Sequence, residues 1–263
     1  MRTTTERPDT AVVPSSARRR QRAIEQLAAG GAIVLCDRID APARGEVVFA
    51  AAHATRELMA FAVRHGSGFI QVALPESRCD ELRLPPMTTA AASGGEPCLG
   101  VTVDAAEGIS TGISAADRAR TARLLADPGT RPDDLCRPGH TVPIRARPGG
   151  AGLADAALEL AVAAGETAAV VLSSVVGVVD PTQLAAGAEL ADFARCHGLP
   201  LAGADEVLAA GASREQTWAN LCAMSQLLAE TPSLLTALGP EQVRQLGSVC
   251  ATVLEHLDTR ACA

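Results

Sequence analysis

The chain has 263 residues, of which 48% are hydrophobic and only 2% aromatic, and its formal net charge is −7. An acidic chain with so few aromatic rings excludes a nucleic-acid groove, which needs a basic face and stacking side chains. Since no apolar run approaches the roughly 18 residues of a membrane span and the N-terminus lacks the apolar core of a signal peptide, we expect a cytoplasmic protein that binds no membrane.

Helix and strand patterns alternate along most of the chain. Residues 1–19 are rich in Thr, Pro, Ser and Arg and are predicted to form a disordered tail. Hydrophobic periodicity then predicts the following elements: a helix over 22–30, strands over 32–36 and 46–51, a helix over 55–66, strands over 69–74 and 99–105, helices over 114–127 and 154–165, a strand over 168–176, a helix over 181–198 and a strand over 199–203. The alternation predicts one α/β (α+β) domain over residues 20–211.

The pattern changes after Gly211. Residues 213–230 and 239–257 both read as amphipathic helices with no strand between them, and Ser213 and Gln216 form a capping box at the start of the first. Residues 212–263 are therefore predicted to be a helical C-terminal extension. Because this segment is too short for a robust core of its own, we expect it to pack on the main domain or on a second copy, and we expect a homodimer.

Three stretches combine glycine with charged or hydroxyl side chains: "RHGSG" at 64–68, "AEGISTGISAADR" at 106–118 and "RPGH" at 137–140. The second places hydroxyls and backbone amides at a helix start, a geometry that receives anions. The third is predicted to be a rigid turn that aims an imidazole. The candidate substrate-binding residues are Arg64, His65, Ser67, Thr111, Ser114 and Arg137, and the candidate acid or base is His140. Taken singly, each stretch is also typical of an ordinary turn or helix cap.

In this order and spacing, and together with "GGAIVLCD" at 30–37 and "LRLPPM" at 82–87, these stretches resemble the 3,4-dihydroxy-2-butanone 4-phosphate (DHBP) synthase family. The resemblance covers about residues 20–210. It implies a DHBP synthase-like fold with a mixed sheet and a homodimer with active sites near the subunit interface. It also implies magnesium-dependent conversion of ribulose 5-phosphate to dihydroxybutanone phosphate and formate. The GTP cyclohydrolase II domain of bifunctional relatives would not fit into residues 212–263.

The loop "DRIDAPARGE" at 37–46 departs from the pattern that the resemblance implies, Asp-Asp-Glu-x-Arg-Glu-Asn-Glu-Gly-Asp. Asp37 matches and Glu46 replaces an Asp. However, Pro42 stands at the position of the metal-binding Glu, and Arg44 reverses the charge of a later Glu. Because proline offers magnesium no side-chain oxygen, the loop predicts that this ligand is lost.

Three further positions depart from the family pattern. Leu153 stands where the family has its second metal ligand, a His, and Arg147 does not match the family's phosphate-binding Arg. The strand that carries a catalytic Glu in the family has Ser173 and Ser174 in that neighbourhood. We therefore expect no metal cofactor and a loss of the standard synthase activity.

Retention of one half of the family's pocket favours a repurposed enzyme. It would run a metal-independent acid/base reaction of lyase, isomerase or cyclase type on an unknown small molecule, in specialised metabolism. His140, Asp37 and Glu46 would then be the catalytic proton carriers. Two alternatives stay open: a non-catalytic partner protein, in which the same residues form turns and caps, and a working synthase with relocated ligands.

Overall fold

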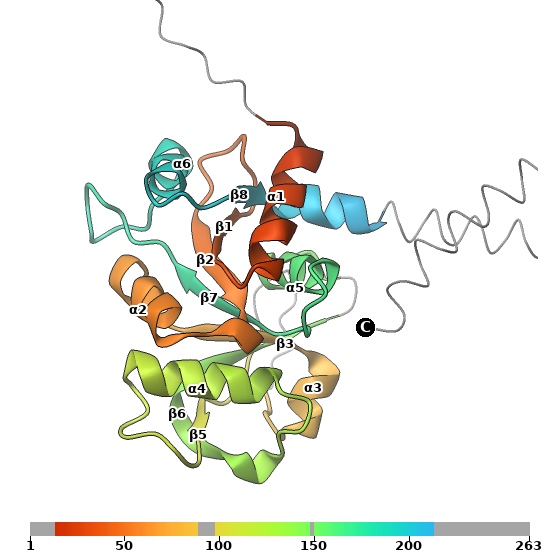
Figure 1. Ribbon diagram of the computed structural model, residues 1–263, viewed down its shortest axis with the longest axis vertical. Coiled ribbons are helices and arrows are strands. Elements are labelled where there is room, and N and C mark those ends of the chain that lie inside the picture. The colour runs from red at the N-terminus through yellow and green to blue at the C-terminus, as the bar shows by residue number, and fades with distance from the viewer. Residues whose placement is uncertain (1–13, 89–97, 148–149, 213–263) are drawn as a thin grey trace, which may run out of the picture.

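The computed structural model describes residues 14–88, 98–147 and 150–212 (Figure 1). The predicted helical extension after residue 212 and most of the predicted N-terminal tail lie outside the described residues. The helices are α1 (Ser16–Ala28), η1 (Ala51–His53), α2 (Arg56–His65), α3 (Glu76–Glu81), α4 (Ala115–Ala126), η2 (Pro132–Asp134), α5 (Leu153–Ala163), α6 (Gly187–Cys196) and a last helical stretch over 204–212. The strands are β1 (Ile33–Cys36), β2 (Gly45–Ala50), β3 (Gln71–Pro75), β4 (Cys98–Leu99), β5 (Val103–Ala105), β6 (Leu135–Ala146), β7 (Val170–Ser174) and β8 (Leu201–Gly203).

The strands form one mixed sheet in the order β4-β6-β3-β7-β2-β1-β8, and β5 pairs with β6 beside this path. The pairs β1–β8 and β3–β6 are parallel, and the other pairs are antiparallel. This arrangement confirms the α/β (α+β) fold class that the sequence predicts.

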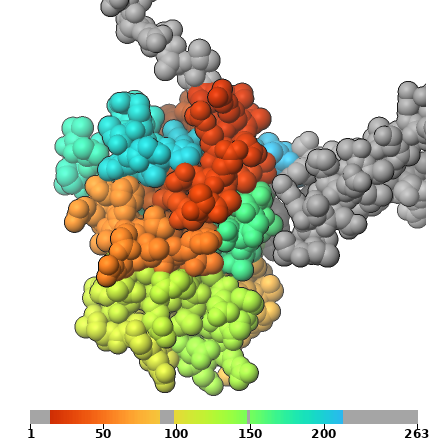
Figure 2. Space-filling model, in the orientation of Figure 1, coloured from red at the N-terminus to blue at the C-terminus, as the bar shows by residue number. Residues whose placement is uncertain are grey.

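Helices cover both faces of the sheet (Figure 1). Successive strand residues point to opposite faces, so Val48 and Phe49 of β2 enter two different apolar cores. The Phe49 core is covered by α2, α4 and α6, and the Val48 core is covered by α1, α5 and the stretch 204–212. Residues 98–147, which include α4 and β6, form the lower part of the molecule in Figure 2.

Several predictions differ from the structure. Helix α1 begins at Ser16, so residues 16–19 of the predicted disordered tail are helical. The predicted strand 99–105 is divided into β4 and β5. Residues 137–140, predicted as a turn, lie within strand β6. A side chain at Gly139 would overlap the backbone of Val103, so glycine permits the close approach of β5 to β6 here. The predicted helix 181–198 begins only at Gly187, because Thr182 donates two hydrogen bonds to the Asp180 carboxylate and closes a turn.

No helix in the described ranges is long and apolar enough to cross a membrane.

Candidate active site

Asp104 on β5 and His140 on β6 form a carboxylate–imidazole pair. Asp104 Oδ2 lies 2.7 Å from His140 Nδ1, and Asp104 Oδ1 accepts a 2.9 Å hydrogen bond from the His140 backbone N–H. The Asp104 side chain is 5% exposed, whereas the imidazole is 42% exposed. A carboxylate at Nδ1 favours a proton on that nitrogen and makes Nε2 the proton acceptor. The sequence predicted His140 but missed Asp104, which reads as an acidic residue inside an apolar strand.

Gly112 allows this pair to pack tightly against the loop before α4. Its φ is +84°, and a Cβ there would overlap the Asp104 carboxylate and lie 2.8 Å from His140 Nδ1. Asp117 holds the loop in place by accepting hydrogen bonds from the Ser110 hydroxyl at 2.8 Å and the Gly112 N–H at 3.1 Å. The Ser110 hydrogen bond is the main reason that the pKa of Asp117 is lowered.

Arg118 on α4 connects this loop to the segment that follows α2. Its Nη1 donates a 2.9 Å hydrogen bond to the Gly68 carbonyl. Burial lowers the pKa of the Arg118 guanidinium, and the nearby Asp104 charge acts in the opposite direction. The two predicted substrate-binding residues Thr111 and Ser67 lie in different places. Thr111 precedes Gly112, which packs against the Asp104–His140 pair. The Ser67 N–H donates a 2.8 Å hydrogen bond to the Ser174 carbonyl on β7, the strand that also contacts Glu46.

Two other predicted substrate-binding residues have local partners. Ser114 Oγ accepts a 3.1 Å hydrogen bond from the Asp117 N–H and caps α4, as its sequence position indicated. Arg137 donates to main-chain carbonyls of three residues, Leu82, Pro132 and Leu135. These contacts give both residues a supporting role, and direct contact with a substrate stays a prediction.

His65 belongs to a different environment from His140. At the end of α2 its ring lies 4.7 Å, between centroids, from both Phe61 and His197, and Phe193 of α6 completes the cluster. Burial lowers the pKa of His65, and the His197 and Arg64 charges lower it further. The cluster joins α2 to α6. The structure thus places His65 in a helix–helix contact, and Arg64 beside it is exposed.

Glu46 is a half-buried carboxylate on β2. Its Oε1 accepts a 2.7 Å hydrogen bond from the Ser174 hydroxyl on β7, opposite in the register. Its Oε2 is buried and has no hydrogen-bond partner among the described residues. Burial raises the pKa of Glu46 to about 7, with a smaller contribution from the Asp37 charge and an opposing one from Ser174. A carboxylate with a pKa near neutrality can both take and give a proton.

The two aspartates of the acidic loop before Glu46 lie in different environments. Asp40 forms a 2.8 Å ion pair with Arg38, and this hydrogen-bonded contact lowers the pKa of Asp40. Asp37 is exposed, and its main-chain carbonyl accepts a hydrogen bond from the Asp205 N–H. Pro42 lies against the start of α6, where a Cβ on Gly187 would be 3.5 Å from the Pro42 Cα. Of the loop carboxylates, Asp37 is therefore the one whose charge acts on Glu46.

Glu46 and His140 lie at the same end of the sheet. Val48, Leu172, Gln71 and Val142 form one row across β2, β7, β3 and β6. Glu46 precedes Val48 by two residues on β2, and His140 precedes Val142 by two residues on β6. With three strand spacings between them, the two residues are on the order of 15 Å apart within one subunit.

Solved structures similar to this chain include synthases. The crystal structure of 3,4-dihydroxy-2-butanone 4-phosphate synthase of Candida albicans is 35% identical, with a TM-score of 0.64, over 72% of this chain and 95% of that one. The structure of a 3,4-dihydroxy-2-butanone 4-phosphate synthase in complex with two magnesium ions is 34% identical, with a TM-score of 0.67, over 73% of this chain and 96% of that one.

Curated relatives are more similar in sequence but longer. Riboflavin biosynthesis protein RibBA of Nocardia farcinica is 45% identical over 193 residues, which are 72% of this chain and 47% of the relative. The protein of the same name from Salinispora tropica is 49% identical over 160 residues, which are 59% of this chain and 40% of the relative. The chain thus spans about half the length, or less, of these relatives.

These comparisons correct two expectations from the sequence. The expected metal-independent, repurposed reaction in specialised metabolism is wrong, because relatives at 44–49% identity are named as riboflavin biosynthesis proteins. The expected absence of a metal cofactor is also wrong, because a related synthase holds two magnesium ions. Both expectations rest on the departures from the family pattern, chiefly Pro42 and Leu153, although Glu46 keeps a buried carboxylate oxygen without a hydrogen-bond partner among the described residues.

The residues that match the relatives form the domain that contains Glu46 and the Asp104–His140 pair. The family model for 3,4-dihydroxy-2-butanone 4-phosphate synthase matches residues 21–210, a span that begins within α1 and ends in the last described helical stretch. It includes the Asp104–His140 pair, Glu46 and the sheet that positions them. The chain therefore belongs to the 3,4-dihydroxy-2-butanone 4-phosphate synthase family.

Proposed function

We propose that the chain is a working synthase of riboflavin biosynthesis, which converts ribulose 5-phosphate to 3,4-dihydroxy-2-butanone 4-phosphate and formate with magnesium. The observation that carries this proposal is the state of Glu46. It is a half-buried carboxylate with one oxygen without a partner among the described residues and a pKa of about 7, and it stands at the end of the acidic loop. A reaction that rearranges a carbon skeleton next to a carbonyl needs such a group to move protons.

The carboxylates of the loop fit a magnesium ion. The described residues contain no group of three or more His, Cys, Asp or Glu side chains that could hold a metal. Magnesium, however, is usually bound through one or two carboxylates together with water and substrate oxygens. Asp37 and Glu46 supply two carboxylates whose negative charges repel each other, so a cation between them would be stabilising, and Glu46 Oε2 has no hydrogen-bond partner among the described residues. We assign the ion to these two residues, in a family member that departs from the usual pattern at Pro42 and Leu153.

Two groups of the chain, Glu46 and His140, would carry the proton transfers. When bound, magnesium would polarise neighbouring oxygens of the substrate. Glu46, oriented by the Ser174 hydroxyl, accepts or returns a proton near that position. His140 accepts or returns a second proton at Nε2, while the Asp104 carboxylate holds Nδ1 and stabilises the charged ring. Thr111, next to Gly112 beside the imidazole, and Ser67, beside Ser174, would hydrogen-bond the substrate.

We also propose a homodimer, in which the two groups come from different subunits. Within one subunit Glu46 and His140 are too far apart for one small sugar phosphate to reach both. Phe69 and Ile113, which flank the Arg118–Gly68 contact, are 48% and 56% exposed, and large apolar side chains on the surface mark interaction sites. Light scattering should give the mass of two subunits, and the double variant Phe69→Asp, Ile113→Asp should give one. A monomeric unmodified chain would remove this proposal.

The enzyme is proposed to work in the cytoplasm. The five cysteines in the described part of the chain are all free thiols, as expected in a reducing compartment.

The synthase proposal predicts formate release from ribulose 5-phosphate. With magnesium present we expect turnover on the order of 1 to 10 per second, the ordinary range for enzymes, and after chelation with EDTA we expect none until magnesium is returned. The Asp40→Asn variant is a control, because Asp40 is exposed and paired with Arg38, and its turnover should equal that of the unmodified chain. If the folded chain releases no formate at any magnesium concentration, the proposed function is wrong.

A further inference from the structure

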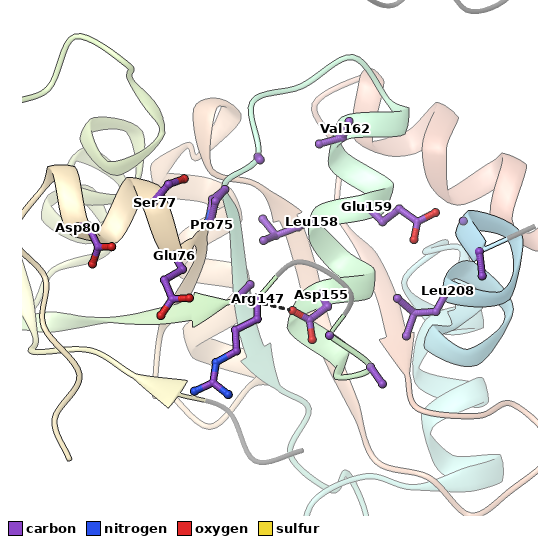
Figure 3. Close-up of a pocket in the computed structure, with 16 residues that line it drawn as sticks. Pro75, Glu76, Ser77, Asp80, Arg147, Asp155, Leu158, Glu159, Val162 and Leu208 are labelled. Carbon is purple, nitrogen blue, oxygen red and sulfur yellow. Dashed lines mark hydrogen bonds between the residues drawn. The ribbon is translucent and has the colours of Figure 1, made fainter. Parts of the chain in front are cut away.

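A cavity of about 810 Å³ lies beside the last residues of β3 and β6, Pro75 and Ala146 (Figure 3). It is bounded by the start of α3, the end of β6, one side of α5 and the last described helical stretch, 204–212. Figure 3 shows Val162, Glu159 and Asp155 along α5, with Leu208 of that stretch on one side of the helix and Arg147 on the other. Neither the proposed reaction nor the magnesium assignment uses any of these residues.

Three acidic side chains around the cavity already form ion pairs or hydrogen bonds within the protein. Asp80 and Glu76 both pair with Arg145, at 2.7 and 3.2 Å. The Asp155 carboxylate accepts hydrogen bonds from the Gly152 and Arg147 N–H groups and so caps α5. A cation or a basic peptide would have to compete with these partners, which argues against a cationic ligand.

Several other side chains that line the cavity are apolar. Leu158, Ala168 and Leu208 pack on the adjoining core, and Val162 is 57% exposed although it lies within α5. An apolar strip bordered by satisfied polar groups is the surface that an amphipathic helix covers.

An amphipathic segment of the sequence follows directly after residues that line the cavity. The last two described residues, Gly211 and Ala212, line the cavity, and 51 residues of the sequence follow them, from 213 to 263. In residues 213–230 the apolar side chains Trp218, Leu221, Cys222 and Leu228 recur at helical spacing. A helix of this length would span roughly 27 Å, which is ample for the cavity, and no linker separates it from the cavity rim.

We propose that residues 213–230 dock as an amphipathic helix into this cavity of their own chain, with the face that contains Trp218 against Val162, Leu158 and Leu208. The occupant is the same molecule rather than a second copy, because the segment leaves the described structure at the cavity itself. The proposal is independent of the synthase reaction.

Trp218 is the only tryptophan in the sequence, so its fluorescence tests the proposal on the full chain. We expect the blue-shifted emission of a shielded indole and weak quenching by iodide. Val162→Lys places a charge in the apolar strip, at an exposed position where lysine is a good helix former. In that variant the emission should shift to the red, and iodide quenching should approach that of N-acetyltryptophanamide in the same buffer.

The matched control is Val178→Lys, which changes an exposed valine, 69% exposed, outside the cavity. It should leave the emission and quenching unchanged, and circular dichroism should show both variants folded. A water-exposed Trp218 in the unmodified chain would overturn the proposal, as would shielding that Val162→Lys does not reduce. Shielding that is lost on dilution would place the segment on a second copy, and would overturn it as well.

Discussion

Formate release should fall by about 100-fold to 10,000-fold when His140 is replaced by Ala, because a positioned acid–base group contributes rate enhancements of that order. Asp104→Asn should have an effect of similar size. A neutral amide does not fix the proton on Nδ1, and it does not stabilise the positively charged ring as the carboxylate does. Asp104 is a positioning residue that contacts the imidazole. Its variant should therefore lower kcat while leaving the KM for ribulose 5-phosphate nearly unchanged.

The chain contains a matched control for the His140 variant. His53 also pairs with a carboxylate, Glu166, at 3.0 Å, and its side chain is 44% exposed, which is close to the 42% of His140. His53→Ala therefore removes an equivalent surface pair away from the proposed site and should leave kcat unchanged. Equal losses in the His53 and His140 variants, or a loss for His140→Ala explained by unfolding in a thermal melt, would show that the Asp104–His140 pair is structural.

Glu46→Gln should abolish turnover and, at alkaline pH, make the folded chain more stable. Folding raises the Glu46 pKa from 4.5 to about 7. Its favourable contribution is therefore fully present below pH 4.5, where the group is protonated in both states, and is lost as the pH rises through 7. After a discount for partial exposure, the unmodified chain should lose about 2 kcal/mol of unfolding free energy between pH 4.5 and pH 8 from this residue. The Gln variant should not show this loss.

Urea unfolding at several pH values, with and without magnesium, measures this difference. Magnesium at pH 8 should restore stability to the unmodified chain, because it binds the folded state through the charged carboxylate, and should have a much smaller effect on Glu46→Gln. The control is Glu81→Gln, since the Glu81 side chain is 63% exposed and lies on α3. A pH dependence that is the same in unmodified chain and Glu46→Gln would refute the assignment of both the raised pKa and the ion.

The sequence predicts the elements of this fold well where their periodicity is strong, as in α2, α4 and α5. It fails at β6, because Pro138 and Gly139 are typical of turns, and only the close approach of β5 explains a glycine within this strand. Asp104 could not be predicted as the partner of His140, because 36 residues separate them in the chain and the β5–β6 pairing brings them together. The state of Glu46 could not be predicted from the sequence either, because it depends on burial in the folded sheet and on the hydrogen bond from Ser174 on another strand.

Glu46 is a residue of a strand and not of the loop that leads to it. It is paired with Leu35 on one side and Ser174 on the other, so two neighbouring strands set its position. Substitutions in residues 38–44 can therefore accumulate over evolution without displacing this carboxylate. The backbone position of Glu46 is thus set by the sheet and is separate from the sequence of the loop, in which Pro42 and Arg44 lie.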